Sequence, residues 1–380
     1  MSAARPPEGA RPPEGERREA THGGGDTREQ RTLLADTVDR LFRDAAPSAP
    51  LQADGWSASL WQHIEHLALP LLLVPEEAGG IGGTWDDAFV VLHGLGYYAV
   101  ALPVAEAMLA TRVAALARLD LPAGVVSLAT RTTGYLARDG RGRARFTGEL
   151  LGVPWGRHAS SVVGVLRDGG AHVVVVSRND ATSLQEHHNL AGEPRDTLCY
   201  ADADVTIARC DAEETTHAQS FGALLRIGQI AGALDAVLAR TIQYAKERSQ
   251  FGKAIGSFQA VQQQLAVLAS ETAAVGAAAR AAFRSAALGE AGFEIASAKL
   301  RANRAIDVVT AIAHQVHGAI GFTREYELRR CSQRLWSWRT EFGNDRYWSG
   351  VLGTTVAAAG AAAFWSELTR RGDRFALKDQ

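Results

Sequence analysis

The feature that most constrains the fold is a change of hydrophobic period along the chain. From Phe221 onward, apolar residues recur at three- and four-residue spacing through long runs, which is typical of helices. These runs are FGALLRIGQIAGALDAVLARTIQYAKER, SFQAVQQQLAVLASETAAVGAAARAAFRSA and FEIASAKLRANRAIDVVTAIAHQVH, followed by one alanine-rich helix over SGVLGTTVAAAGAAAFWSEL. Alanine-rich helices of this length favour a four-helix bundle that also buries a face against a copy of itself or a relative.

The first half contains another helical region and then a β-rich one. Helical spacing runs from Thr32 to about Leu119, interrupted at PEEAGGIGG, where Pro75 and the glycines end one helix. We expect DDAFVVLHGLGYYAVALPVAEAMLATRVAAL to form one or two buried helices. Between Leu121 and Ala208 the segments are short, rich in Val and Thr, and separated by turn residues, which indicates strands: ARFTGELLGVPW, SSVVGVLR, AHVVVVSR and LCYADADVTIA.

The predicted architecture is therefore α+β: a helical domain, a small middle β-domain and a C-terminal four-helix bundle. The predicted boundaries are a disordered tail at 1–28, an all-α domain at 29–120, the β-domain at 121–212 and the bundle at 213–380. The tail is expected to be disordered because the near-repeat ARPPEGARPPEGERRE is polar and rich in Pro and Gly.

Charge and cysteine content exclude several classes of function. The formal net charge of -2, from 40 basic and 42 acidic residues, gives no indication of nucleic acid or an anionic membrane as a partner. No signal segment is visible and no window of eighteen residues is uninterruptedly apolar, so we expect a soluble, cytoplasmic protein with no transmembrane helix. The three cysteines are widely spaced and show no metal pattern, so reduced thiols in or near the core are expected: Cys199, Cys210 and Cys331.

A first candidate ligand-binding stretch follows the first long helix of the second half. Arg248, Gln250, Phe251 and Gly252 stand within five residues. An arginine is able to donate forked hydrogen bonds to a phosphate, and Phe251 is able to lie against a flat ring. In the structural alternative, Arg248 caps the helix, Phe251 packs in the core and Gly252 ends the helix. On local grounds alone the structural alternative is the commoner case.

A second candidate stretch, HQVHGAIGFTREYELRR, begins at residue 314. Gln315, His317, Gly318 and Gly321 lie at the end of a long predicted helix, where a glycine turn lets backbone groups approach a ligand closely. His314 and His317 have a spacing that metal sites also use. No further ligand stands nearby in the sequence, so no metal site is expected.

Together, and in this order, the two stretches resemble the hallmarks of the acyl-CoA dehydrogenase family. That family has an RxQFG turn followed by IGxFQ and, further along, a QxHGGxGFTxEY segment. The corresponding segments here are 248–252, 255–259 and 315–326, and PEEAGGIGG is similar to a loop in the family's first half. The resemblance covers roughly residues 30–365, and Ala319 replaces the family's second glycine.

The resemblance implies a bacterial flavoprotein that performs α,β-dehydrogenation of an acyl-CoA thioester with bound FAD. A glutamate removes the α-proton in a dry pocket, and the β-hydrogen leaves as hydride to the flavin. The resemblance also implies a homo- or hetero-tetramer with a related chain, and an electron-transfer flavoprotein as electron acceptor. Residues implied to bind the ADP half of FAD across a subunit interface are Arg248, Gln250, Phe251, Gly252, Gln315, His317, Gly318 and Gly321.

Two departures concern the ring of the flavin. The family's TEPxxGSD loop has no counterpart in VVSLATRTTGYLARDGRGRARF. Its WITN-type segment would fall near 152–155, where Trp155 is displaced by three positions. Trp155 is therefore a candidate flavin contact or, as the structural alternative, a packed aromatic of the β-domain.

A third departure concerns the catalytic base. The base position of most relatives corresponds to Phe342, and the position used by a minority corresponds to Gly222. Glu341, one residue before the first position, is the candidate base, with Asp345 a lesser one. In the structural alternative Glu341 is an ion-pair partner of one of two nearby arginines, Arg334 or Arg339.

The retained segments are those that reach FAD in a neighbouring subunit, whereas the altered ones act within the same chain. We therefore hypothesise one subunit of a heteromeric acyl-CoA dehydrogenase with two copies of each of two related chains. Relatives of that kind act on bulky acyl chains of sterol or polyketide type. The alternatives are a self-sufficient dehydrogenase that uses Glu341, and a non-catalytic scaffold homologue. Flavin-based oxygen or nitro chemistry has no feature in its favour.

Overall fold

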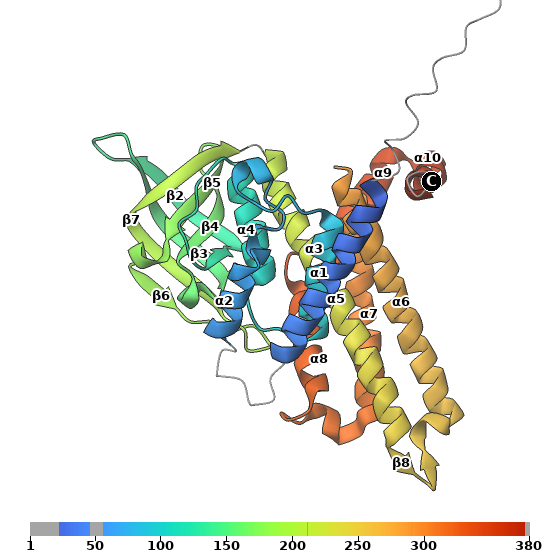
Figure 1. Ribbon diagram of the computed structural model, residues 1–380. Helices are drawn as coiled ribbons and strands as arrows, with labels where there is room; N and C mark the ends of the chain where they lie inside the picture. The colour runs from blue at the N-terminus through green and yellow to red at the C-terminus, as the bar shows by residue number, and fades with distance from the viewer. Residues whose placement is uncertain (1–22, 46–55, 211, 290, 377–380) are drawn as a thin grey trace, which may run out of the picture.

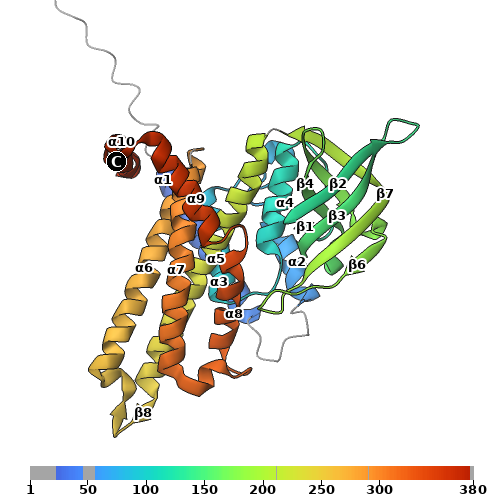
Figure 2. The ribbon, with the colours of Figure 1, turned by 180° about the vertical axis from the view of Figure 1, so that it is seen from behind.

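The computed structural model describes residues 23–45, 56–210, 212–289 and 291–376, and it confirms the predicted α+β architecture. A β-domain lies to one side of a long helical bundle, and N-terminal helices lie between them in both views (Figures 1 and 2). The predicted tail lies outside the described residues as far as residue 22. The first helix, α1 (Gly23–Ala45), begins earlier than the predicted boundary at residue 29.

The N-terminal helices pack against both the sheet and the bundle. They are α1, α2 (Ala58–His66), α3 (Trp85–Tyr97) and α4 (Val104–Leu116), with short 3-10 turns at Leu69–Leu71 and Glu76–Ala78. Thr84 caps α3 by accepting from the Asp87 backbone N–H at 3.2 Å, while the Asp87 carboxylate accepts from the Thr84 N–H at 2.9 Å. The segment expected to form one or two helices therefore forms two, and Ala99 (φ +51°) lies in the turn between them.

Two glycines set how closely α3 crosses the bundle. A Cβ atom on Gly96 would stand 1.9 Å from the Gln229 carbonyl oxygen, and one on Gly232 would stand 1.9 Å from the His93 carbonyl oxygen. No side chain fits at either position, so the two backbones approach directly. This contact fixes α3 against the central bundle helix.

The β-domain is one seven-stranded sheet with strand order β1-β4-β5-β7-β3-β2, and β6 pairs with β7. Its strands are β1 (Val126–Leu128), β2 (Arg131–Arg138), β3 (Ala144–Pro154), β4 (Ser161–Arg167), β5 (Ala171–Ser177), β6 (Ser183–Gln185) and β7 (Arg195–Cys210). β7 pairs with β3 through its first half (Leu150 opposite Leu198) and with β5 through its second (Val174 opposite Ile207). The two halves of the sheet therefore pack around a shared apolar core.

Sequence patterns predict four of these strands, β3, β4, β5 and β7, but not β1, β2 or β6. Most β2 residues are exposed, so the strand lacks the alternation of buried and exposed residues that identifies a half-buried strand. Its pairing with β3, with Leu136 opposite Phe146, depends on residues distant in sequence.

The bundle is built on α5 (Ala212–Glu247), which contacts α3, α6, α7 and α8. The other bundle helices are α6 (Gln259–Ala287), α7 (Gly292–His317), α8 (Glu327–Thr340), α9 (Asp345–Ala359) and α10 (Ala361–Ala376). A hairpin of β8 (Ser249–Gln250) and β9 (Lys253–Ala254) lies at the far end of the bundle in Figure 1. The prediction of one alanine-rich last helix is wrong, because Gly360 (φ +77°) separates α9 from α10 and the two are bent by 113°.

Two helices of the described chain are long and apolar enough to cross a membrane by length and composition alone. The most apolar window of α5 is 83% buried within the protein, which the central position of α5 explains. The corresponding window of α6 is only 28% buried. Many of the exposed residues of α6 are alanines, among them Ala266, Ala273 and Ala277.

Candidate functional site

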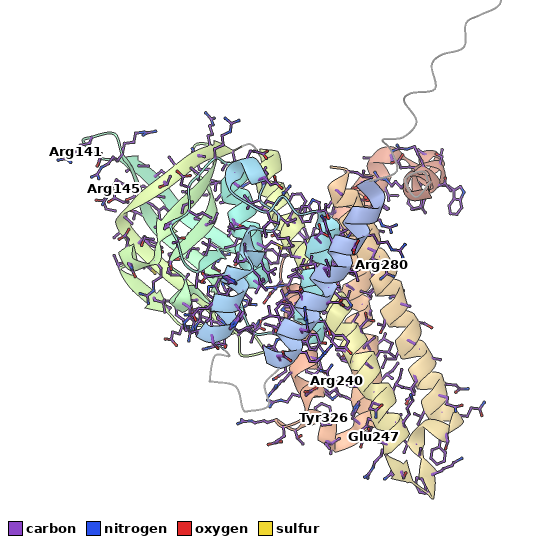
Figure 3. The ribbon with its side chains drawn as sticks, viewed as in Figure 1. Arg141, Arg145, Arg240, Glu247, Arg280 and Tyr326 are labelled. Atoms are coloured by element: carbon purple, nitrogen blue, oxygen red, sulfur yellow. The ribbon has the colours of Figure 1, made fainter. Side chains whose placement is uncertain are left out.

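The two predicted ADP-binding segments lie side by side at one end of the bundle, here called the bundle tip (residues 244–258 and 314–326). The ring of Tyr244 stacks on that of His317 with centroids 4.4 Å apart, and the Tyr326 ring lies 5.2 Å from His317. These contacts join the last turn of α5 to the end of α7. Figure 3 labels Tyr326 and Glu247 at this end of the molecule.

The hairpin contradicts the structural alternative for the first segment. Phe251 is 91% exposed, so it does not pack in the core. Phe251 and Gly252 form the two-residue turn with φ +52° and +81°, as a tight hairpin requires, so Gly252 does not end the helix. Gln250 is exposed. The Arg248 side chain is also exposed and makes no hydrogen bond or ion pair with another described residue.

The second segment forms an open turn directly after α7. Gln315 and Gly318 are exposed, and Gly318 adopts φ +65°, ψ -145°, which favours glycine. A Cβ atom at Gly318 would meet nothing within 4 Å, so the backbone is open to a ligand. Gly321 is buried, and a Cβ there would stand 3.1 Å from the His314 ring. Gly321 therefore allows the turn to pack closely against His314, where a side chain would be crowded.

His317 lies inside the turn rather than on its surface. Its Nδ1 is 2.8 Å from the Ala313 carbonyl oxygen, and its Nε2 is buried without a hydrogen-bond partner. Burial lowers the pKa of His317, so the ring is neutral at neutral pH. His314 is buried as well, with Nε2 2.8 Å from the Ser332 hydroxyl. Among the described residues no group of three or more His, Cys, Asp or Glu side chains is placed to hold a metal ion.

A buried ion cluster joins the three domains at what we call the domain junction. It contains three carboxylates and three guanidinium groups: Glu106, Glu193, Glu341, Arg195, Arg226 and Arg334. Glu341 lies at its centre, with Arg195 Nη2 2.9 Å from Oε1 and Arg226 Nη2 2.7 Å from Oε2. The cluster is electrically balanced, which a buried group of charges requires.

This environment keeps Glu341 ionised. Burial alone would raise the pKa of Glu341, but the charges of Arg195 and Arg226 lower it to about 2. A base that removes a weakly acidic proton needs the opposite shift. The predicted catalytic role of Glu341 therefore stays a prediction that the electrostatics disfavour.

The partners suggested for Glu341 by sequence proximity are wrong. Arg334 instead pairs with Glu193 at 2.9 Å. Arg339 pairs with Asp307 at 2.6 Å and with Asp345 at 2.9 Å, which also places the lesser candidate base in an ion pair. The observed partners Arg195 and Arg226 are 146 and 115 residues away in sequence.

The side chain of Phe342, the residue after Glu341, lies against α5 at Gly222. Phe342 adopts φ +54° and its carbonyl accepts a hydrogen bond from the Trp348 indole N–H at 3.1 Å. A Cβ atom at Gly222 would stand 2.2 Å from the Phe342 ring. The two sequence positions that resemblance assigns to a catalytic base are thus in contact, and both are apolar.

A cavity of about 490 Å³ opens beside Phe342, between the β-domain and α5. It is lined by Leu128, Ala129, Thr130, Arg131, Thr132, Thr133, Gly134, Val165, Leu166, Arg167, Ala218, Gln219 and Phe342. Trp155 does not line it. That ring is 2% exposed and lies 5.2 Å from the Arg195 guanidinium, as a packed aromatic of the β-domain.

A further buried cation, Lys299, supports the end of α8. Lys299 is fully buried and its Nζ donates to the Trp338 and Arg339 carbonyl oxygens, each at 3.0 Å, and to Asn303 Oδ1 at 2.8 Å. Burial lowers the pKa of Lys299 to about 7. None of the three cysteines, all within the described residues, forms a disulfide.

The helical domain, the β-domain and the bundle with two polar turns at its tip together form the fold of an acyl-CoA dehydrogenase. Residues 215–347 match the family model described as acyl-CoA dehydrogenase, C-terminal domain. The chain is 31% identical over 313 residues to acyl-CoA dehydrogenase IpdE2 of Mycobacterium tuberculosis, across 79% of this chain and 89% of that protein.

Solved structures agree on the fold. The chain matches the ChsE4–ChsE5 complex from Mycobacterium tuberculosis with TM-score 0.78 and 21% identity, over 88% of this chain and 98% of that one. It matches a Tcur3481–Tcur3483 steroid ACAD with TM-score 0.75 and 22% identity, over 87% and 98%. The chain belongs to the acyl-CoA dehydrogenase family, whose members are FAD flavoproteins.

Proposed function

We propose that this chain is one subunit of a heteromeric acyl-CoA dehydrogenase. In that assembly it completes the FAD site of a related chain and leaves proton abstraction to that chain. The observation that carries the proposal is the contact of Phe342 with Gly222, because neither position that would bear the base carries a carboxylate. The chain alone is then catalytically silent, and the assembled pair performs the dehydrogenation.

The bundle tip fits the adenine-nucleotide half of FAD. The exposed Arg248 guanidinium is suited to the diphosphate, because its fork of donors matches two phosphate oxygens. Gln250 and Gln315 offer exposed amides beside it, and the open backbone at Gly318 allows close approach. When bound, FAD supplies the acceptor for the hydride that leaves the acyl-CoA. These side chains bind and orient, and none of them moves a proton.

The chain's own junction lacks the means to deprotonate a substrate. Glu341 is held by two guanidinium groups and stays ionised, since the pKa of that carboxyl is lowered to about 2. The Phe342 ring stands where a carboxylate would be needed. Because Glu341 is ionised with a strongly lowered pKa and Phe342 carries no titratable group, neither residue is suited to remove an α-proton.

Two further observations favour assembly with a related chain. The apolar window of α6 is only 28% buried, so a large alanine-rich face remains for another subunit to cover. Two of the structural neighbours are complexes of two different chains, ChsE4–ChsE5 and Tcur3481–Tcur3483, and the second is a steroid ACAD. We propose a bulky acyl-CoA of this kind as substrate of the complex, and an electron-transfer flavoprotein as its oxidant.

The proposal is tested by measuring flavin per chain. The chain is purified alone and together with a related, adjacently encoded chain. We expect no bound FAD in the first preparation and one FAD per pair of different chains in the second, with acyl-CoA-dependent reduction of a dye only in the second. A homotetramer of this chain with one FAD per chain, and with turnover abolished by Glu341→Gln, would overturn the proposal.

A further inference from the structure

Lys299 is a fully buried cation that the proposed function does not use. It lies on α7, and its Nζ donates to three oxygens: Asn303 Oδ1 at 2.8 Å and the Trp338 and Arg339 carbonyls, each at 3.0 Å. An ammonium group has three N–H donors, so all three are used. A neutral amine has only two, so loss of the proton leaves one of these oxygens without a donor. The surroundings of Nζ therefore match the charged form of Lys299.

The two carbonyls belong to the last turn of α8, which ends at Thr340. The last four carbonyl oxygens of a helix have no partner within that helix, and a lysine near the C-terminus is able to bond to them. Lys299 supplies this cap from a different helix, because α7 packs against α8. The ammonium group thereby fixes where α8 ends and where the next residues begin.

The next residues, Glu341 and Phe342, form a corner between α8 and α9. Glu341 is the central carboxylate of the buried ion cluster, and the Phe342 ring lies against Gly222. The Arg339 carbonyl that Lys299 bonds stands only two residues before Glu341. A movement at the end of α8 therefore displaces both side chains of the corner.

The proton on Lys299 is held against a strong opposing effect. Burial favours the neutral amine and lowers the pKa of Lys299 to about 7. The charges around it act in both directions. Glu341 at the corner and Asp345 on α9 favour the ammonium, whereas Arg226 on α5 and Arg339 on α8 oppose it. Two carboxylates and two guanidinium groups thus offset each other, and the three acceptors at Nζ compete with burial.

We propose that Lys299 is a positioning residue: its ammonium group caps α8 and keeps Glu341 and Phe342 in place, and the neutral amine releases the end of α8. Loss of one proton then loosens the contact between the bundle and the β-domain that Glu341 makes. The inference goes beyond the proposed function and does not rest on it, because it concerns only the corner of this chain and the helices that hold it.

The test is hydrogen–deuterium exchange of the full chain alone, measured by mass spectrometry on peptides that cover residues 336–345. Protection factors are compared, because they remove the intrinsic rise of the exchange rate with pH. We expect the protection of the last turn of α8 to fall several-fold between about pH 6 and about pH 9, with a midpoint near pH 7. Peptides from the buried centre of α5 should keep their protection throughout.

Three variants separate positioning by the proton from simple packing. Lys299→Met should show the low protection at every pH, because it never caps α8. Arg304→Met is the matched control, since Arg304 is an exposed cation on the same helix and makes no hydrogen bond or ion pair with another described residue. Asn303→Ala removes one acceptor of the ammonium and should move the midpoint to lower pH by about one unit.

Three results would overturn the inference: protection of the last turn of α8 that does not change with pH in the wild type, a wild-type profile in Lys299→Met, or an unmoved midpoint in Asn303→Ala. If Lys299→Met does not fold, the wild type and Asn303→Ala still decide. None of these measurements involves FAD or a second chain, so a failure here leaves the proposed function standing. Conversely, failure of the proposed function leaves this titration unchanged.

Discussion

The bundle tip and the domain junction use the same pair of residue types in opposite ways. At the tip, the Arg248 guanidinium and the Phe251 ring are exposed. At the junction, Arg226 is buried between carboxylates and the Phe342 ring lies against Gly222. Both phenylalanines adopt left-handed backbone angles, with φ +52° and +54°.

The difference lies in what holds each strained residue. A non-glycine residue in this region costs about 1–2 kcal/mol. At the junction the protein itself compensates, because the Trp348 indole donates to the Phe342 carbonyl and the ion cluster fixes Glu341 beside it. At the tip, an edge-on contact with Phe258 is the only ring contact that the Phe251 ring makes among the described residues. The junction is held together within one chain, whereas the side chains of Arg248 and Phe251 at the tip are exposed.

The largest effect is expected from removing the central carboxylate of the junction. Glu341→Ala leaves Arg195 and Arg226 buried with only Glu193 and Glu106 to balance them, which should cost about 3–5 kcal/mol of unfolding free energy. Denaturant unfolding of the chain alone measures this loss. Asp307→Ala removes an exposed partner of Arg339 and is the control, with a cost of about 1 kcal/mol or less. Equal losses in the two variants would show that the cluster does not hold the domains together.

Acid should weaken the ion pairs of Glu341 with Arg195 and Arg226. The pKa of Glu341 is lowered from 4.5 to about 2, so the stabilisation is fully present above pH 4.5 and is lost as pH falls towards 2. The shift corresponds to about 3 kcal/mol. We expect the unfolding free energy of the wild type to fall more steeply over this window than that of Glu341→Gln. Parallel curves for the two proteins would mean that Glu341 is not held by its arginines in solution.

The two segments that form the tip could be picked out from the sequence and the junction could not, for a physical reason; the binding role of the tip stays a prediction. Arg248 to Gly252 and Gln315 to Gly321 are contiguous segments, so their residue types and spacing are visible directly. The junction joins residues more than a hundred positions apart, such as Glu106, Arg226 and Glu341, and only packing brings them together. One local signal was available: Arg226 interrupts an apolar helical run, and a charge there must be paired.

Glu341 illustrates the limit of counting along the chain. Sequence spacing places it one residue from the base position, which suggests a small shift of register. Consecutive residues at the end of a helix point in different directions, however, and Phe342 faces the cavity while Glu341 faces the ion cluster. Glu341 is therefore held inside the ion cluster, whereas the Phe342 ring lines the cavity at the edge of that cluster, 5.8 Å from the Arg226 guanidinium.

A third test addresses the tip within the complex. Arg248→Ala should raise the dissociation constant of FAD from the assembled pair about tenfold to a hundredfold, because one charged hydrogen-bonding group contributes about 1.5–3 kcal/mol. Flavin fluorescence on dilution measures the release. Arg280→Ala is the matched control, since Arg280 is exposed on α6 away from the tip and makes no ion pair with another described residue (Figure 3). Equal flavin release by both variants would remove Arg248 from the site.

The smallest effect separates strain from contact. Phe251→Gly relieves the left-handed backbone strain, but it also adds the entropy cost of glycine, and the two effects oppose each other. The ring is exposed and contributes little to the core. The unfolding free energy of the chain alone should therefore change by less than about 1 kcal/mol. The assembled pair should nevertheless lose flavin several-fold faster, because the ring that faces outward is gone. If the variant stabilises the chain and leaves flavin retention intact, the hairpin turn serves only to connect α5 to α6. The tip and the junction would then differ only in how deeply their arginine and phenylalanine side chains are buried.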